Sequence, residues 1–212
     1  SLPNSMHFKY GMLALKNNVN VIIDKPITLS LIELKLLVRL AIKKRKLIAE
    51  AIIFNYHNQF RKALEILKTK KNIQMIISNF TIPIPDKNNI KMSPILGGGV
   101  NNDMGPYLAA LIRIFFNDIN FSLNVNYKKK SVVENLTCLV SKKNVSLFSY
   151  FAFGNEYSNQ LTIYTNKIIL KINSVFSPNP FLKTELEVKK NNKTKKYIIK
   201  ENSSFYNFFL EY

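Results

Sequence analysis

The chain has 212 residues, and its hydrophobic content of 47% is enough to fill the core of one large domain or of one and a half ordinary ones. A single cysteine, Cys138, excludes an internal disulfide framework, and with only two histidines beside it we expect no metal site. No apolar run is long enough to cross a bilayer and no signal peptide is recognisable, so we expect a cytoplasmic protein without a membrane partner.

The formal net charge of +18 could indicate a nucleic-acid partner. The lysines are scattered, however, and Lys, Asn and Ile are abundant together, as an AT-rich coding sequence would produce. The densest basic segment, Val188 to Lys200, is typical of two strands around an Asn-rich turn, where lysines discourage edge-to-edge pairing. We therefore predict no nucleic-acid partner, with a basic nucleic-acid-binding module as the less favoured alternative.

In chain order, the first predicted element is a helix with Met6, Tyr10 and Leu13 at helical spacing. Residues 19–24, VNVIID, follow as a buried strand, and Pro26 keeps Lys25 extended behind it. The next helix begins at a capping box, and residues 46–54 form a second buried strand. The capping pair and the expected apolar stripe of that helix are Ser30 and Glu33, then Leu31, Leu34, Val38, Ala41 and Ile42.

The remaining pattern changes to an α+β arrangement. A helix over residues 58–70 should bury Phe60, Ala63, Leu64 and Leu67, and residues 73–84 read as a strand. Seven further strands, separated by short polar breaks, favour an antiparallel sheet. They are predicted at residues 121–127, 131–141, 145–153, 159–165, 167–173, 184–190 and 195–200, before a final serine-capped helix.

Two stretches contain residue types that suit catalysis. Lys25 stands at the carboxyl end of a strand, which is where wound α/β folds bind ligands, although an exposed ion pair at a strand end would look the same. In LGGGVNNDMGPY, Asp103 and Tyr107 stand four residues apart at the start of a helix that should run to Phe116. The alternative interpretation is a glycine turn, a capping aspartate and a partly buried tyrosine.

Together these stretches resemble the glucose–fructose oxidoreductase, inositol dehydrogenase and rhizopine-catabolism (Gfo/Idh/MocA) family. LPNSMH is similar to a loop of the family's Rossmann domain, and VIIDKP to its Glu-Lys-Pro motif with Asp24 in place of the glutamate. EAIIFNYHNQF resembles the strand that leaves the nucleotide domain, and KMSPILGGGVNNDMGPY resembles the substrate-domain motif of glycines, aspartate and histidine or tyrosine. FGNEYSNQLTIY and FSPNP resemble later strands in members that act on nucleotide-linked sugars.

The resemblance implies a role for each matching residue. Lys25, Asp103 and Tyr107 would be catalytic, with Lys25 beside the nicotinamide and the substrate hydroxyl. The other residues expected to bind NAD or NADP are Pro3, Asn4, His7, Asp24 and Pro26, and those expected to bind the sugar with Asp103 and Tyr107 are Asn55, His57 and Lys91. Asn55 and Lys91 each stand where many relatives have an arginine.

The resemblance also implies the architecture. Residues 1–55 would be the C-terminal part of an NAD(P)-binding Rossmann domain, and residues 56–212 an α+β substrate-binding and oligomerisation domain that is truncated at its end. The fold would combine a Rossmann remnant with a large, mostly antiparallel open sheet flanked by helices. The protein would form a homo-dimer or tetramer through this open sheet. The implied function is hydride transfer between nicotinamide and a sugar, nucleotide-sugar or polyol carbon. A non-catalytic sugar-binding relative is the alternative.

The first prediction concerns cofactor affinity. The 212 residues contain no strand followed by a glycine-rich, phosphate-binding turn, so this chain alone should bind NADH weakly. Calorimetric titration of NADH into the chain should give a dissociation constant well above the micromolar range. Micromolar binding would contradict the prediction.

Overall fold

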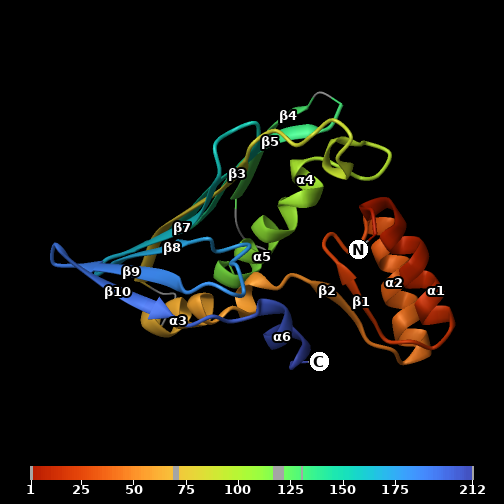
Figure 1. The fold of residues 1–212 in the computed structure, drawn as a ribbon, viewed down its shortest axis with the longest axis horizontal. Helices are drawn as coiled ribbons and strands as arrows, with labels where there is room; N and C mark the ends of the chain where they lie inside the picture. Colours follow the sequence, from red (N-terminus) through yellow and green to blue (C-terminus); the bar gives the residue numbers. More distant parts are fainter. Residues whose placement is uncertain (1, 69–71, 117–121, 130, 212) are drawn as a thin grey trace.

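The computed structural model describes residues 2–68, 72–116, 122–129 and 131–211. Two sheets organise the chain, a small one made by its first third and a large one made by the rest (Figure 1). The first third contains a 3-10 turn, Asn4–Met6, and then α1 His7–Lys16, β1 Val21–Asp24, α2 Leu31–Lys44 and β2 Ile48–Ala51. This is the predicted order of helix, strand, helix and strand.

The small unit is a parallel pair of strands with two helices packed together on it. β1 and β2 pair in register from Val21 with Ile48 to Asp24 with Ala51. A separate core of Leu15, Ile23, Leu37 and Ala41 lies between the strands and the helices. Gly11 allows this close packing, because a Cβ there would lie 2.7 Å from the Cδ1 atom of Ile23.

The expected apolar stripes of these two helices were partly wrong. α1 buries His7, Gly11 and Leu15. α2 buries Leu37 and Ala41. The main contacts of α1 are with α2 and β1, and the buried face of each helix is narrow. The residues of the predicted stripes that stay exposed are Met6, Tyr10, Leu13, Leu31, Val38 and Ile42.

The large unit is an eight-stranded sheet in the order β10-β9-β8-β7-β3-β6-β5-β4. All neighbouring strands are antiparallel except β3 and β6, which are parallel. The mostly antiparallel sheet predicted from the sequence is therefore confirmed. The strands are β3 Ile73–Ile82, β4 Ser122–Lys129, β5 Val133–Lys142, β6 Val145–Phe153, β7 Ser158–Thr165, β8 Ile169–Asn173, β9 Thr184–Lys190 and β10 Lys193–Ile199.

Alternation along the strands separates a covered face from an open one. One row of cross-strand partners on the covered face is fully or almost fully buried, whereas the adjacent row on the other face is partly exposed. The buried row is Val140, Leu147, Ile76, Ile163, Leu170 and Val188, and the adjacent row is Leu139, Phe148, Ile77, Thr162, Lys171 and Glu187. The helices lie on the buried-row side.

The helices of the large unit are α3 Asn58–Leu67, α4 Val100–Asp103, α5 Gly105–Phe115 and α6 Ser204–Phe209, preceded by a 3-10 turn at Phe54–Tyr56. The face predicted for α3 is confirmed: Phe60, Ala63 and Leu67 are buried and Leu64 packs against the core. The sequence predicted that this helix continues to Lys70. The last two residues of the predicted helix lie outside the described ranges. α6 begins at the expected serine cap, where the Ser203 hydroxyl accepts from the Tyr206 amide.

The two units have separate hydrophobic cores, as a division near residue 55 predicts. The exact boundary between residues 1–55 and 56–212 stays a prediction. Within the described ranges, no helix is both long and apolar enough to span a membrane.

A glycine loop connects the sheet to α4. Gly99 has a φ of +104°, which favours glycine, and its amide donates to the Lys91 carbonyl. A Cβ at Gly98 would lie 2.7 Å from the carbonyl oxygen of Ile90 and closer still to that of Lys91. The glycines thus let this loop fold back on the turn at residues 90–92.

Gly98→Ala should therefore destabilise the protein by about 1–3 kcal/mol, because the new methyl group meets backbone atoms that cannot rotate away. Gly105→Ala is the matched control, since nothing lies within 4 Å of a Cβ at that position. Urea unfolding followed by circular dichroism measures both. Equal midpoints for the two variants would show that the loop is not packed in this way.

Candidate active site

Lys25 stands where β1 ends, and its side chain crosses from the small unit to the large one. The Lys25–Pro26 peptide bond is cis. The Lys25 Nζ atom lies 2.8 Å from Asp103 Oδ1 and also donates to the Asp103 backbone carbonyl. The lysine is thus held by a residue 78 positions further along the chain.

Asp103 is held between two ammonium groups. Its second carboxylate oxygen, Oδ2, lies 2.5 Å from the Nζ atom of Lys91. Burial acts to raise the pKa of Asp103, but the charges and hydrogen bonds of Lys25 and Lys91 outweigh it, so this pKa lies below its ordinary value. Asp103 is therefore ionised at neutral pH and fixes the position of both lysines.

The sequence placed Asp103 in the first turn of a helix that runs to Phe116, and this was wrong. Asp103 is the last residue of the short helix α4, and α5 begins two residues later at Gly105. Met104 stands between the helices with a φ of −115° and is fully buried. The chain turns there because Met104 enters the core, which the spacing of two polar residues cannot reveal.

Tyr107 lies on α5 beneath the Lys25 ammonium group. The Nζ atom of Lys25 is 5.0 Å from the centroid of the Tyr107 ring. The same ring stacks on Phe176 with centroids 5.2 Å apart, and Tyr107 is only 9% exposed. Burial, with Asp103 and Asp24 nearby, raises the pKa of the phenol well above its ordinary value. Tyr107 therefore keeps its proton at neutral pH and can donate a hydrogen bond.

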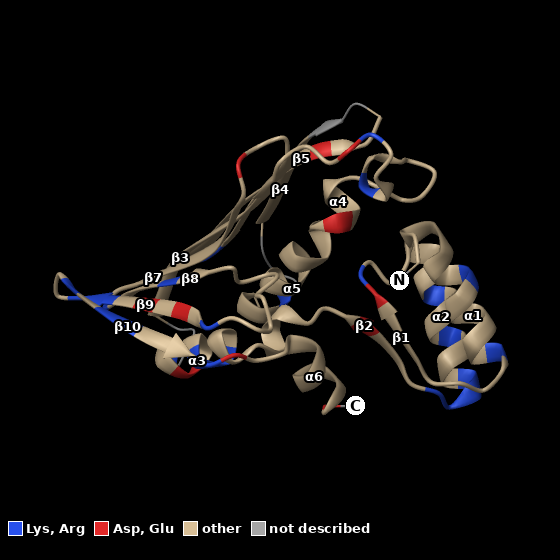
Figure 2. Cartoon of the chain, in the orientation of Figure 1, with Lys and Arg blue, Asp and Glu red and all other residues tan. Residues whose placement is uncertain are grey.

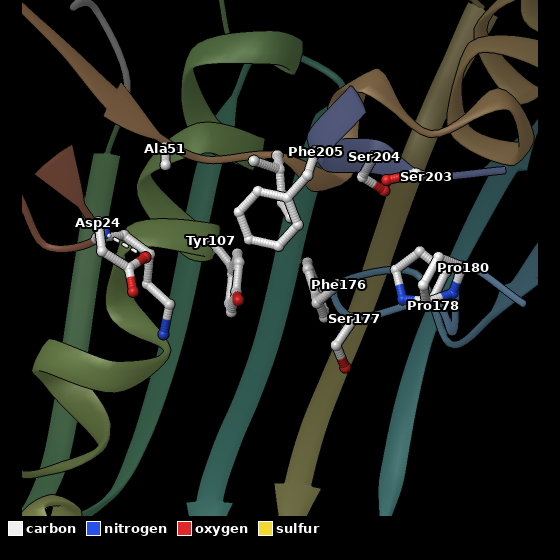
Figure 3. Close-up of a pocket in the computed structure, with 12 residues that line it drawn as sticks. Asp24, Ala51, Tyr107, Phe176, Ser177, Pro178, Pro180, Ser203, Ser204 and Phe205 are labelled. Carbon is white, nitrogen blue, oxygen red and sulfur yellow. Dashed lines mark hydrogen bonds between the residues drawn. The ribbon is translucent and has the colours of Figure 1, made fainter. Parts of the chain in front are cut away.

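A pocket of about 330 Å³ opens beside Lys25 and Tyr107 (Figure 3). Its walls come from both units, including α6 of the large unit, and most of the lining residues are apolar. The lining residues are Asp24, Lys25, Ala51, Ile53, Tyr107, Phe176, Ser177, Pro178, Pro180, Ser203, Ser204 and Phe205. A volume of this size can hold a small polar ring such as a sugar.

Several residues with predicted cofactor roles surround the turn that contains Lys25. Asp24 lines the pocket and accepts from the Lys25 amide at 2.8 Å. Pro3 precedes the first 3-10 turn, and the Asn4 side chain donates to the Gly97 carbonyl at 2.9 Å. His7 is buried, with Nδ1 2.8 Å from the carbonyl oxygen of Pro26.

Asn55 and His57 are not among the residues that line this pocket, and their binding of the sugar stays a prediction. His57 is fully buried, its Nδ1 atom accepts from the Gln59 amide at the start of α3, and burial lowers its pKa. Asn55 lies in the turn before it, with a buried side-chain oxygen. The capping role of His57 accounts for that residue, because the chain must turn inward at the start of α3.

Sequence reasoning missed the far wall of the pocket. The stretch FSPNP resembled a strand, but it lies in the loop between β8 and β9. Phe176 is buried there between aromatic rings, and its neighbours Ser177 and Pro178 line the pocket. Two prolines within three residues were the available signal for a loop. Phe205 of α6 had no signal at all, because only tertiary packing brings it here.

The pKa of Asp103 leads to a test of pH dependence. A carboxyl whose folded pKa lies below its ordinary value of 3.8 contributes stability above that value and loses it as pH falls through the folded pKa. Asp103→Asn should therefore cost about 1.5–3 kcal/mol at pH 7, and this difference from the wild type should shrink below about pH 4. Urea unfolding at pH 3 to 7 measures it. A difference that stays constant over this range would contradict the ion pairs.

The sequence of the chain is similar to those of several known proteins. Residues 1–52 match the GFO_IDH_MocA model, described as an oxidoreductase family with an NAD-binding Rossmann fold. The chain is 22% identical over 210 residues to a dTDP-3,4-didehydro-2,6-dideoxy-α-D-glucose 3-reductase of Actinomadura kijaniata, covering 96% of the chain and 63% of the relative. It is 27% identical over 116 residues to a D-xylose 1-dehydrogenase (NADP⁺) of Haloferax volcanii, covering 54% and 36% respectively.

Solved structures give the same fold. The 3-ketoreductase KijD10 of Actinomadura kijaniata, solved with NADP and TDP-benzene, has a TM-score of 0.89 at 21% identity over 99% of this chain and 66% of that one. An aldose-aldose oxidoreductase of Caulobacter crescentus, solved with glycerol, has a TM-score of 0.83 at 13% identity over 93% and 61%. The chain thus spans slightly less than two thirds of these relatives. Residues 1–52 are thus similar to the Gfo/Idh/MocA family of oxidoreductases, and the whole chain shares the fold of these solved oxidoreductases.

Proposed function

We propose that this chain forms the reacting end of an NAD(P)-dependent oxidoreductase that moves a hydride to or from a sugar or nucleotide-sugar carbon. The observation that carries the proposal is the convergence of Lys25, Asp103 and Tyr107 at one pocket, although they come from different units of the fold. An ammonium group and a protonated phenol at one point suit an oxygen whose charge changes during a reaction.

Each side chain has a distinct part in this proposal. The ion pair with Asp103 holds the Lys25 ammonium group in place, where it orients and polarises the reacting oxygen. Tyr107 donates a hydrogen bond to the same oxygen and passes its proton when a carbonyl oxygen gains negative charge. In the opposite direction, the hydroxyl proton returns by the same route. Lys91 secures the second oxygen of Asp103 rather than lining the pocket.

The pocket mouth suits the nicotinamide end of a cofactor. Asp24 and Lys25 stand at the carboxyl end of a parallel strand, and the small side chain of Ala51 borders the opening from β2. When bound, the cofactor would supply the hydride acceptor or donor. Residues 1–55 would form part of its binding domain and residues 56–212 the substrate domain.

The substrate class follows from the apolar walls and from the relatives. Three serines and the Lys25 group stand among aromatic rings and prolines, which suits a sugar with few free hydroxyls. The Actinomadura relative is a reductase of a dTDP-linked dideoxy sugar, and the Haloferax relative is a xylose dehydrogenase. Both are similar to this chain in sequence. These similarities support a sugar or nucleotide-sugar substrate for the protein that carries it.

The proposal includes a homo-oligomer and a cytoplasmic location. The sheet face opposite α5 carries no described helix (Figure 1), and Phe148 and Ile77 lie partly exposed in one row on it. The buried free thiol of Cys138 agrees with a reducing compartment. Among the described residues, the basic side chains are spread over α1, α2 and the β9–β10 hairpin (Figure 2), so nucleic acid is not part of the proposal.

Lys25→Met tests the chemistry. In the full-length natural protein it should lower turnover by about 10²–10⁴-fold while leaving cofactor affinity within a few-fold, because it removes the charge that polarises the oxygen. Lys35→Met on exposed α2 is the matched control. NAD(P)H absorbance with a panel of sugars and dTDP-sugars measures turnover. Unchanged turnover in Lys25→Met would refute the proposed role.

Light scattering tests the oligomer. The protein should be a dimer or tetramer, and Phe148→Glu should shift it toward the monomer, because a charge on the open face resists burial in an interface. Ile32→Glu on α2 is a control at a 73% exposed position in the other unit. A monomeric wild type would overturn this part of the proposal.

A further inference from the structure

His7 is buried beneath the turn that contains Lys25, and both of its ring nitrogens face backbone carbonyls. Nδ1 lies 2.8 Å from the Pro26 oxygen and Nε2 lies 3.2 Å from the Leu2 oxygen, while the residue is only 4% exposed. A carbonyl oxygen can only accept a hydrogen bond, and a neutral imidazole has only one N–H. At least one ring nitrogen of His7 therefore donates to a backbone carbonyl, and the shorter contact is the one between Nδ1 and the Pro26 oxygen.

Glu50 holds the other edge of the same peptide group. It lies on β2 opposite Ile23 of β1, and its Oε1 atom accepts from the Ile27 amide at 2.9 Å. The Pro26 carbonyl and the Ile27 amide belong to one peptide unit, and this unit directly follows Lys25–Pro26. His7 and Glu50 therefore grip a single peptide from its two sides, which fixes the plane of that peptide.

The charges around this peptide are complementary. Burial raises the pKa of Glu50, while the Ile27 hydrogen bond and the nearby charges of Lys25 and His7 oppose that rise. Asp24 is the second carboxylate close to Glu50, and Tyr10 borders the same groove as His7. Glu50 and His7 therefore lie close to each other as well as to the peptide that both contact.

We propose that His7 and Glu50 are positioning residues: together they clamp the Pro26–Ile27 peptide and thereby aim Lys25 at Asp103 and Tyr107. The importance of this aim for catalysis rests on the proposed function. The clamp itself does not, and it can be tested on this 212-residue chain without any turnover.

The chain has only two histidines, which makes nitrogen NMR of ¹⁵N-histidine-labelled protein decisive. The Nδ1 atom of His7 should carry a proton, because it faces the Pro26 carbonyl at the shorter of its two contacts. His57 is the internal control: its Nδ1 accepts from the Gln59 amide, so its proton should be on Nε2. A His7 ring without a proton on Nδ1 would overturn the proposal.

Two variants of Glu50 test its hydrogen bond to the Ile27 amide. Glu50→Gln keeps an oxygen acceptor, so hydrogen exchange of this amide should stay slow, whereas Glu50→Ala removes the acceptor and should speed the exchange. Glu65→Gln, at an exposed pair with Lys62 on α3, should leave the exchange of the Ile27 amide unchanged. Equal exchange of the Ile27 amide in the wild type and in Glu50→Ala would show that Glu50 does not hold this peptide.

Lys25 itself reports whether the clamp aims it. Its terminal methylene protons should resonate upfield, because the side chain lies over the Tyr107 ring. This shift should persist in Glu50→Gln, which keeps the acceptor, and should be largely lost in Glu50→Ala, which removes it. A folded Glu50→Ala protein with unchanged Lys25 signals would overturn the positioning role. If Glu50→Ala does not fold, the proton on Nδ1 of His7 and the exchange of the Ile27 amide in Glu50→Gln decide, and fast exchange in Glu50→Gln would contradict the clamp.

Discussion

The ion pair between Lys25 and Asp103 is the constraint on which the site depends. It joins a turn at the end of the small parallel sheet to the kink between α4 and α5. Both side chains are largely buried, at 15% and 18% exposure, so the solvent screens the pair much less than a surface pair. Because the partners belong to separate hydrophobic cores, any shift of one unit against the other must stretch or break this contact. The pocket between the units therefore keeps its shape only while the pair is intact.

Around this pair the chain places two kinds of support. Aromatic rings of the large core, among them Phe54 and Phe176, hold Tyr107 at fixed angles under the ammonium group. Polar contacts to the backbone hold the other side, where His7 and Glu50 contact the peptide after Pro26. The site thus combines an apolar platform that excludes water with a backbone that cannot rotate. This combination is what preorganisation of charge requires.

Much of the architecture could be read from the sequence because local patterns decide it. Continuous apolar runs gave the two parallel strands, and alternation with polar breaks gave the strands of the large sheet. The convergence of Lys25 with Asp103 and Tyr107 came from the resemblance to a family, since no local pattern places residues so far apart in contact. The predicted apolar faces of α1 and α2 were partly wrong, because a short amphipathic pattern does not show how much of a helix surface its neighbours cover. The sequence could not show that His57 caps α3, because this contact depends on the path of the chain before that helix.

The order of strands in the large sheet has a consequence for how the protein is made. β3 is the earliest of the eight strands in the chain, yet it lies in the middle of the sheet, paired with β6 and β7. During synthesis both of its hydrogen-bonding edges stay without their native partners until most of the polypeptide has left the ribosome. Contacts between segments so distant in sequence form slowly. The nascent chain therefore exposes an apolar strand with unpaired edges for a prolonged time, which favours binding by chaperones during synthesis.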